Sequence, residues 1–145
     1  MTKCSEVMTG KPVCCLPDDV VSRAAKLMKV GNIGSIPVIE SEQNMKLVGI
    51  VTDRDLALHI VAEGRDAKST HVKAVMTGNV VTCLADDDLQ KALDAMAQHQ
   101  LRRIPIVDSE SKLVGIIAQA DVATRAHQPE KTAELVKEIS QASPK

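Results

Sequence analysis

The chain has 145 residues, a formal net charge of -1 and 44% hydrophobic residues. This length is enough to bury one hydrophobic core, and the balanced charge argues against a nucleic-acid binder that depends on neutralising phosphates. The sequence has no apolar run near the roughly 20 residues that span a bilayer. Its N-terminal stretch MTKCSEVMTG lacks the apolar segment of a secretory signal. We therefore expect a cytoplasmic protein that binds neither nucleic acid nor membranes.

Phenylalanine, tyrosine and tryptophan are all absent from the chain. The core must therefore be built from valine, isoleucine, leucine, methionine and alanine. A planar ligand ring would have to lie between aliphatic groups, because no aromatic side chain of this chain could stack on it.

The four cysteines are Cys4, Cys14, Cys15 and Cys83. They form no C-x-x-C pair, and the four histidines show no ligand spacing with them. This pattern favours small buried thiols that stay reduced in the cytosol, so no metal site is expected. A redox or metal role remains open, because two of the cysteines are adjacent.

The sequence contains two copies of one unit. The segment VMTGKPVCCLPDD at residues 7–19 returns as VMTGNVVTCLADD at residues 75–87, and IPVIESE at 36–42 returns as IPIVDSE at 104–110. KLVGIV also returns, as KLVGII, after a shorter turn. Self-similarity of this extent predicts a fold made from two copies of one supersecondary unit.

Each copy is predicted to form a strand, a helix, two strands and a helix, which gives an α/β (α+β) fold with two β-α-β-β-α repeats. The copies span residues 7–64 and 75–126, with a linker at 65–74 and a C-terminal helix and tail at 127–145. The first copy has its elements at residues 13–16, 20–30, 36–40, 47–51 and 54–62. The second copy has them at residues 81–84, 89–98, 104–108, 113–117 and 120–126.

Two further signals concern the ends of helices. The aspartate pair in LPDD and in LADD precedes the first helix of each copy and is predicted to cap it. After the second copy, Pro129 can begin a final helix. Leu135, Val136 and Ile139 would form the apolar stripe of that helix.

The β-α-β-β-α units carry the motifs V-M-T, I-P-V and L-V-G-I-V-T-D-R-D. With these motifs the chain resembles a tandem pair of CBS (cystathionine β-synthase) domains from about Val7 to Ala126, and it is similar to stand-alone bacterial pairs such as the hypoxic response protein family. The resemblance implies two repeats packed as a pseudo-twofold pair and an adenosine-containing ligand, such as AMP, ADP, ATP or S-adenosylmethionine, in a cleft between them. It also implies a homodimer formed through the helices, a regulatory role towards an unidentified protein target, and no cofactor.

A polar stretch in the first copy matches the ligand motif of this family at Gly49, Thr52 and Asp55. An aspartate at the start of a helix can accept hydrogen bonds from both hydroxyls of a ribose. The threonine hydroxyl can bind a ribose or phosphate oxygen, and the glycine leaves space for close approach. The alternative is that Thr52 or Asp53 simply caps the helix.

The second copy departs from the motif, because Ala118 replaces the threonine while Asp121 is kept. A lost hydrogen bond to a charged ligand costs about 1.5–3 kcal/mol, so this site should be weaker or empty. The residues of this weaker second site are Val81, Leu101, Pro105 and Asp121.

The resemblance assigns the phosphates to Arg102 and Arg103, whose guanidinium groups suit phosphate oxygens. The alternative is a solvated pair at the edge of a strand. The complete candidate nucleotide site consists of Val13, Ile33, Gly34, Ser35, Ile36, Pro37, Thr52, Arg54, Asp55, Arg102 and Arg103.

The proline of each I-P motif cannot donate to a strand ladder, so a neighbouring carbonyl is left free. Backbone groups near Val13, Ile33 and Ser35 are then expected to bind the adenine edge, while Ile36 and Pro37 cover its face.

No nucleophile, base and orienting group fall together in the sequence, so an enzyme is not expected. Two alternatives to a nucleotide sensor stay open. One is a metal or redox sensor that uses the cysteines and histidines. The other is a ligand-free dimerisation module, which the apolar stripes of the repeat helices would serve.

Overall fold

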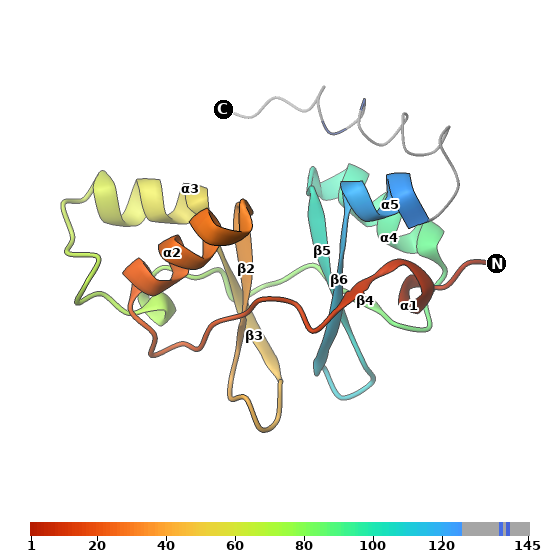
Figure 1. The fold of residues 1–145 in the computed structure, drawn as a ribbon, viewed down its shortest axis with the longest axis horizontal. Coiled ribbons are helices and arrows are strands. Elements are labelled where there is room, and N and C mark those ends of the chain that lie inside the picture. Colours follow the sequence, from red (N-terminus) through yellow and green to blue (C-terminus); the bar gives the residue numbers. More distant parts are fainter. Residues whose placement is uncertain (126–136, 138, 140–145) are drawn as a thin grey trace. The chain divides into compact units, whose positions relative to one another are not determined.

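A computed structural model describes residues 1–125, Lys137 and Ile139 (Figure 1). The chain forms two compact units. The first unit is Val13–Val80, and the second unit combines Met1–Pro12 with the chain from Val81 onward. Each unit contains both strands and helices, as expected for one copy of the repeat. This confirms the predicted α/β fold and the tandem repeat.

The first unit is built around a two-stranded antiparallel sheet. Its elements are α2 (Val21–Gly31), β2 (Ser35–Ile39), β3 (Leu47–Thr52), α3 (Asp53–Leu56), the π-helix η1 (Ala57–Val61) and the 3₁₀ helix η2 (Val72–Ala74). Ser35 lies opposite Thr52 in the β2–β3 pair, so α3 begins beside the first residue of β2. Where a single helix was predicted at residues 54–62, the structure has a short α-helix that continues as a π-helix.

The second unit contains a four-stranded sheet of order β1-β6-β5-β4. Its elements are α1 (Cys4–Val7), β1 (Thr9–Gly10), β4 (Cys83–Leu84), α4 (Leu89–His99), β5 (Arg103–Val107), β6 (Leu113–Ala118) and α5 (Gln119–Arg125). Arg103 lies opposite Ala118 in the β5–β6 pair, as Ser35 lies opposite Thr52 in the first unit. Figure 1 shows α1 and β1 as the red N-terminal segment of this unit.

The two VMTG segments pair with strands in a crossed order. The first VMTG supplies β1, in which Thr9 lies opposite Ile116 of the second unit. The second VMTG belongs to the first unit, where Thr77 forms a bridge with Ile50. The predicted boundaries at 7–64 and 75–126 follow the sequence repeat, whereas the compact units exchange the segment that begins each copy.

The strand glycines explain why these segments fit. A Cβ atom on Gly49 would lie 2.7 Å from the sulfur of Met76 and 2.9 Å from the carbonyl oxygen of Thr77. A Cβ atom on Gly115 would contact Met8 even more closely and would lie 3.0 Å from the Thr9 carbonyl oxygen. In both strands the glycine therefore makes room for a methionine-threonine pair of the chain itself, and not for a ligand.

The first predicted strand of each copy is shorter in the structure than expected. At residues 13–16 only Cys15 pairs, with its N–H donating to the Pro37 carbonyl and its own carbonyl accepting from Ile39. The preceding rung of this parallel ladder would need an N–H on Pro37, which proline lacks. The prediction of a full strand here was wrong, and its counterpart at 81–84 is reduced to Cys83–Leu84.

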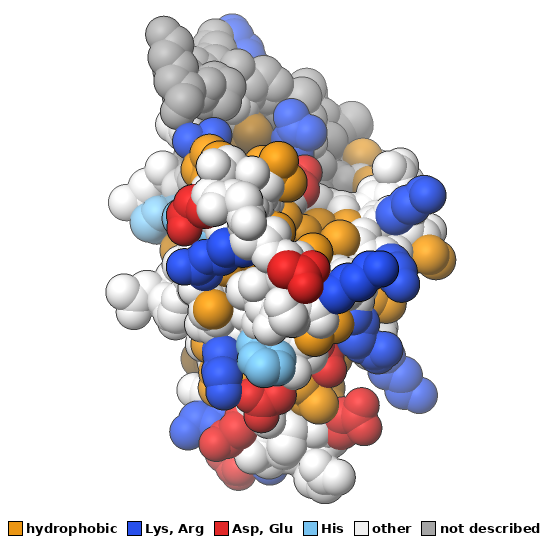
Figure 2. Space-filling view, turned by 90° about the vertical axis from the view of Figure 1, so that its left-hand side faces the viewer, with side chains coloured by type: hydrophobic (Ala, Val, Ile, Leu, Met, Phe, Trp, Pro, Cys, Tyr) orange, Lys and Arg blue, Asp and Glu red, His pale blue; other side chains and the backbone are white. Residues whose placement is uncertain are grey.

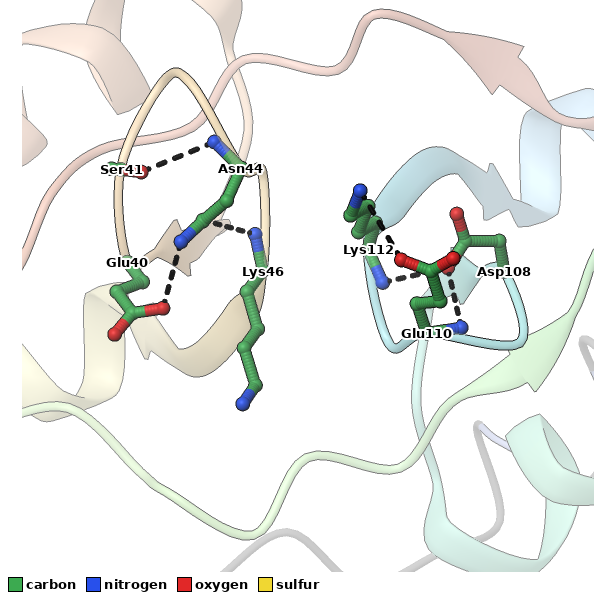
Figure 3. A network of polar contacts seen from close by, with 7 residues as sticks. All are labelled: Glu40, Ser41, Asn44, Lys46, Asp108, Glu110 and Lys112. Atoms are coloured by element: carbon green, nitrogen blue, oxygen red, sulfur yellow. Dashed lines mark hydrogen bonds and ion pairs between the residues drawn. The ribbon is translucent and has the colours of Figure 1, made fainter.

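The two hairpin turns differ in their polar contacts (Figure 3). In the longer turn of the first unit, Asn44 donates its backbone N–H to Ser41 Oγ at 3.1 Å and its side-chain amide to Glu40 at 2.9 Å. In the turn of the second unit, Asp108 Oδ1 accepts from the backbone N–H groups of Glu110 and Lys112. Local hydrogen bonds of this kind let one repeat carry a longer turn without altering its strands.

The first helix of each copy is capped differently from the prediction. Asp19 does not cap α2, because its carboxylate accepts from the Leu16 N–H at 2.8 Å, and Val20 occupies the N-cap position. In the second unit Asp87 bonds to Leu84 in the same way, and the next residue, Asp88, caps α4 by accepting from Gln90. The aspartate pair thus forms a turn before the helix, and of α2 and α4 only α4 has a side-chain cap.

Both cores are made of aliphatic and sulfur-containing side chains, as the missing aromatics require. The core of the first unit contains Cys15, Val21, Ala24, Met28, Ile36, Val38, Val51, Ile60, Val72 and Val75. The core of the second unit contains Cys4, Val7, Cys83, Leu89, Ala92, Leu93, Met96, Ile104, Ile106, Ile117, Val122 and Ile139. Burying one such large aliphatic side chain stabilises the fold by about 1.5–3 kcal/mol.

The final helix predicted from Pro129, including Leu135 and Val136, lies outside the described residues, apart from Lys137 and Ile139, which are helical. Ile139 is buried in the core of the second unit. Within the described part of the chain, every helix is too short or too polar to cross a lipid bilayer.

Candidate nucleotide-binding site

The polar stretch of the first unit forms a reciprocal cap at the start of α3. Thr52 is the N-cap residue, and its hydroxyl accepts from the Asp55 N–H at 3.0 Å. The Asp55 carboxylate accepts in return from the Thr52 N–H, also at 3.0 Å. This capping box shows that Thr52 caps the helix, which is the alternative to ligand binding that the sequence left open.

The same cap also orients the Asp55 carboxylate. Only Oδ2 takes part in the capping box, and within the described residues Oδ1 has no hydrogen-bond donor. Asp55 is half-buried, so this oxygen is held in a fixed direction at the end of the sheet. A fixed acceptor at a helix N-terminus suits a ribose hydroxyl, although Oδ2 is already used by the cap.

The start of β2 completes this end of the first unit. The Gly34 carbonyl accepts from the Asp53 N–H at 2.8 Å, and a Cβ atom on Gly34 would lie 3.0 Å from an Asp53 carboxylate oxygen. Ser35 lies opposite Thr52. The structure therefore brings together Gly34, Ser35, Thr52 and Asp55, as the candidate site requires.

Other predicted residues of the first unit have different surroundings. Ile36 and Pro37 are buried, with Ile36 fully enclosed in the core, so in this conformation their side chains do not face solvent. Ile33 packs partly against the same core, while Val13 is 45% exposed. Arg54 is exposed, and its backbone N–H bonds to the Asp53 carboxylate.

In the second unit the equivalent aspartate has more partners. Asp121 Oδ2 accepts from the Ala118 N–H at 2.9 Å, which repeats half of the capping box. Asp121 Oδ1 accepts from the hydroxyl of Thr9 at 3.3 Å. Arg103 is half-buried and interacts electrostatically with Asp121, and burial lowers the pKa of its guanidinium while the carboxylate opposes that shift.

The remaining predicted residues of the second unit are placed as follows. Arg102 is exposed, and its carbonyl accepts from the Gln119 N–H at 3.1 Å. Pro105 is buried opposite Ile116, and Val81 packs partly against the core. The Leu101 N–H bonds to the end of α4.

Sequence reasoning missed Thr9 as a functional candidate. Its signal was present, because the VMTG segment is repeated in full, including its threonine. The repeat alone gives no reason to pair that threonine with an aspartate more than a hundred positions away.

A small pocket lies near Ile39, at the end of β2 away from Ser35. It has a volume of about 90 Å³. Its lining residues are Cys14, Cys15, Leu16, Asp19, Arg23, Ile39 and Glu42. This volume holds a few water molecules and is too small for a nucleoside.

Three of the four cysteines have a raised pKa, unlike a reactive thiolate, whereas a hydrogen bond with Cys4 lowers the pKa of the fourth, Cys83. Burial raises the pKa of Cys14, and burial with the nearby Asp19 carboxylate raises the pKa of Cys15 to about 12. A hydrogen bond to Cys83, together with burial, raises the pKa of Cys4. Among the described residues, no three or more His, Cys, Asp or Glu side chains are grouped so that they could hold a metal ion.

Similar proteins share this organisation. A CBS domain-containing protein, YhcV of Bacillus subtilis, is 39% identical over 140 residues, which is 97% of this chain and 96% of that protein. The crystal structure of Hypoxic Response Protein I with two coordinated zinc ions matches with a TM-score of 0.77 and 28% identity, over 88% of this chain and all of the other. The crystal structure of CBSX2 in complex with AMP matches with a TM-score of 0.75 and 26% identity, over 90% of this chain and 99% of the other.

The family model of the CBS domain matches the chain twice, at residues 4–62 and 72–127. The two matched segments correspond to the two copies of the sequence repeat, and together they include the Thr52–Asp55 cap and its counterpart at Asp121. This chain therefore belongs to the CBS domain family, of which it carries a tandem pair.

Proposed function

We propose that this protein is a regulatory sensor that binds an adenine nucleotide, of the class of AMP, ADP, ATP or S-adenosylmethionine, and acts on another protein in the cytoplasm. The observation that carries the proposal is the Asp55 carboxylate, which the capping box holds with one oxygen available. The proposal is supported by the AMP bound in the similar CBSX2 structure. It includes no catalytic role.

The ribose is the part of the ligand that this geometry suits best. The available oxygen of the Asp55 carboxylate can accept from a ribose hydroxyl, and a hydrogen bond to a charged acceptor is worth about 1.5–3 kcal/mol. Ser35 and Gly34 lie beside Thr52, so backbone groups of the same strand end are proposed to bind the adenine edge.

The phosphate contacts predicted for Arg102 and Arg103 remain a proposal. Arg102 is the better candidate of the two, because it is exposed and no ion pair to a described residue involves its side chain. Arg103 is half-buried beside Asp121. A bidentate guanidinium contact would distinguish AMP from adenosine.

A homodimer is proposed for the assembly. Val30, Leu58 and Val61 are 87%, 43% and 78% exposed on helical elements of the first unit. Figure 2 shows a face on which hydrophobic side chains lie among acidic and basic ones, with no large area of a single charge. Such a mixed surface suits a protein partner or a second copy better than a nucleic acid.

The decisive experiment is calorimetric binding of adenosine, AMP, ATP and S-adenosylmethionine to the wild type and to Asp55→Asn. The amide oxygen of the variant can still accept from Thr52, so the cap is preserved, while its NH₂ group replaces the available acceptor by a donor. Affinity for adenosine and AMP should fall at least about tenfold in parallel. Asp53→Asn is the matched control and should bind normally, since it removes a neighbouring negative charge but leaves the capping box of Thr52 and Asp55 intact. Unchanged binding by Asp55→Asn would refute the assignment of the ribose to this carboxylate.

A further inference from the structure

Two equivalent aspartates, one in each repeat, have different hydrogen-bond partners. Asp55 and Asp121 occupy the same place at the start of the helix after the second hairpin strand, and each accepts from the N–H three residues earlier. The other oxygen of Asp121 is bonded to the Thr9 hydroxyl. The other oxygen of Asp55 has no such donor within the described residues.

The threonine that makes the difference comes from the crossed VMTG segments. Thr9 and Thr77 are equivalent in sequence, and each lies beside the equivalent strand residue, Ile116 for Thr9 and Ile50 for Thr77. Only Thr9 reaches the aspartate; Thr77 is exposed and makes no hydrogen bond to Asp55 in the described structure.

A second difference adds a charge to the same place. The residue opposite Ala118 is Arg103, whereas the residue opposite Thr52 is Ser35. The Arg103 side chain is half-buried and lies within electrostatic range of Asp121. A half-buried guanidinium is stabilised by a nearby carboxylate, so Asp121 already has a charged neighbour within its own repeat.

We infer that Thr9 and Arg103 close the ribose position of the second repeat, so that Asp121 binds the protein's own N-terminal segment and not a nucleotide. Thr9 provides the hydroxyl that a ribose would otherwise present, and Arg103 neutralises the carboxylate within its own repeat. The inference rests on the proposed function in one respect, namely that an aspartate at this position binds a ribose. It assigns Arg103 to Asp121 and leaves Arg102 as the proposed phosphate contact.

The contact itself can be tested without any ligand. In a double-mutant cycle, Thr9→Val and Asp121→Ala are made singly and together, and the urea midpoint of unfolding is measured. Thr9→Val should lower the midpoint in the wild type and have little further effect once Asp121 is alanine. Arg103→Ser should behave in the same way. Thr77→Val combined with Asp55→Ala is the matched control in the first repeat and should give additive shifts. Additive shifts for Thr9 with Asp121 would overturn the inference, whatever the protein binds.

The closure is tested by counting AMP sites with calorimetry. The wild type should bind about one AMP per chain, and the Thr9→Val, Arg103→Ser variant should bind about two. The added site should disappear when Asp121→Ala is introduced and persist when Asp55→Asn is introduced. A coupled cycle without an added site would mean that the contact exists but does not block a ligand. If wild type and variant both bind no adenosine or AMP, the proposed function fails, and the cycle alone then decides whether Thr9 and Arg103 hold Asp121.

Discussion

At the scale of single residues, the strand glycines show how the repeat uses a missing side chain. Gly49 and Gly115 lie where the methionine and threonine of a VMTG segment approach the strand. The sequence motif suggested that Gly49 makes room for a ligand, but the atoms that fill this space belong to the chain. A motif glycine can thus be required by the packing of the chain itself.

Gly49→Ala should therefore destabilise the first unit by about 1–3 kcal/mol, because the new methyl group would overlap the Met76 sulfur and the Thr77 carbonyl. The measurement is the free energy of unfolding in urea. Gly78→Ala is the control, since a Cβ atom there has no heavy atom within 4 Å. Equal stability of the two variants would show that the VMTG segment can shift away from the strand at little cost.

At the scale of the elements, sequence periodicity was a good guide wherever packing against one face decides the structure. Helices α2 and α4 and the strands of both hairpins lie within about one residue of their predicted ends, because their buried side chains recur at the expected spacing. The elements that were predicted wrongly depend on local hydrogen bonds, which the spacing of hydrophobic residues does not reveal. Pro37 removes one rung of the first ladder, and the aspartate pair is drawn into a turn by the N–H of Leu16 or Leu84.

The candidate site, like the secondary structure, was only partly predictable from the sequence. The spacing of Thr52 and Asp55 placed them at a helix start with Thr52 as a possible cap, but the return bond from the Thr52 N–H to the Asp55 carboxylate was not predicted. The bond between Thr9 and Asp121 depends on the crossed pairing of the VMTG segments, which a repeat in the sequence leaves undetermined.

The caps of α2 and α4 give a prediction at this scale. Asp88→Ala should cost about 1 kcal/mol of unfolding free energy, because the Asp88 carboxylate accepts from the Gln90 N–H at the start of α4. Asp86→Ala should be nearly neutral, since Asp86 is exposed and has only a long ion pair with Lys3, at 3.9 Å. The measurement is the free energy of unfolding of both variants in urea. A larger loss of stability for Asp86→Ala would mean that the turn, and not the cap, stabilises α4.

At the scale of the whole molecule, the chain passes twice between its two units, at Pro12 to Val13 and at Val80 to Val81. The second unit is therefore assembled from both ends of the described chain. Its core contains Cys4 and Val7, which are 0% and 1% exposed, together with residues that follow Val81. The N-terminal segment also supplies strand β1 and the Thr9 hydroxyl. This segment is therefore part of the second unit, although it precedes the first unit in the sequence.

Deleting residues 1–10 should consequently weaken the second unit much more than the first. The deletion removes two core side chains, the pairing of β1 with β6, and the backbone bonds from Cys4 and Ser5 to Asp87 and Ala85. Loss of several buried contacts of this kind costs several kcal/mol in order of magnitude. Hydrogen exchange followed by mass spectrometry should show faster exchange in peptides covering β5 and β6, with protection retained in peptides covering β2 and β3.

The variant Ser5→Ala, at an exposed position of the same segment, should exchange like the wild type. Uniform loss of protection in the deletion variant would instead mean that the two units unfold as a single cooperative structure.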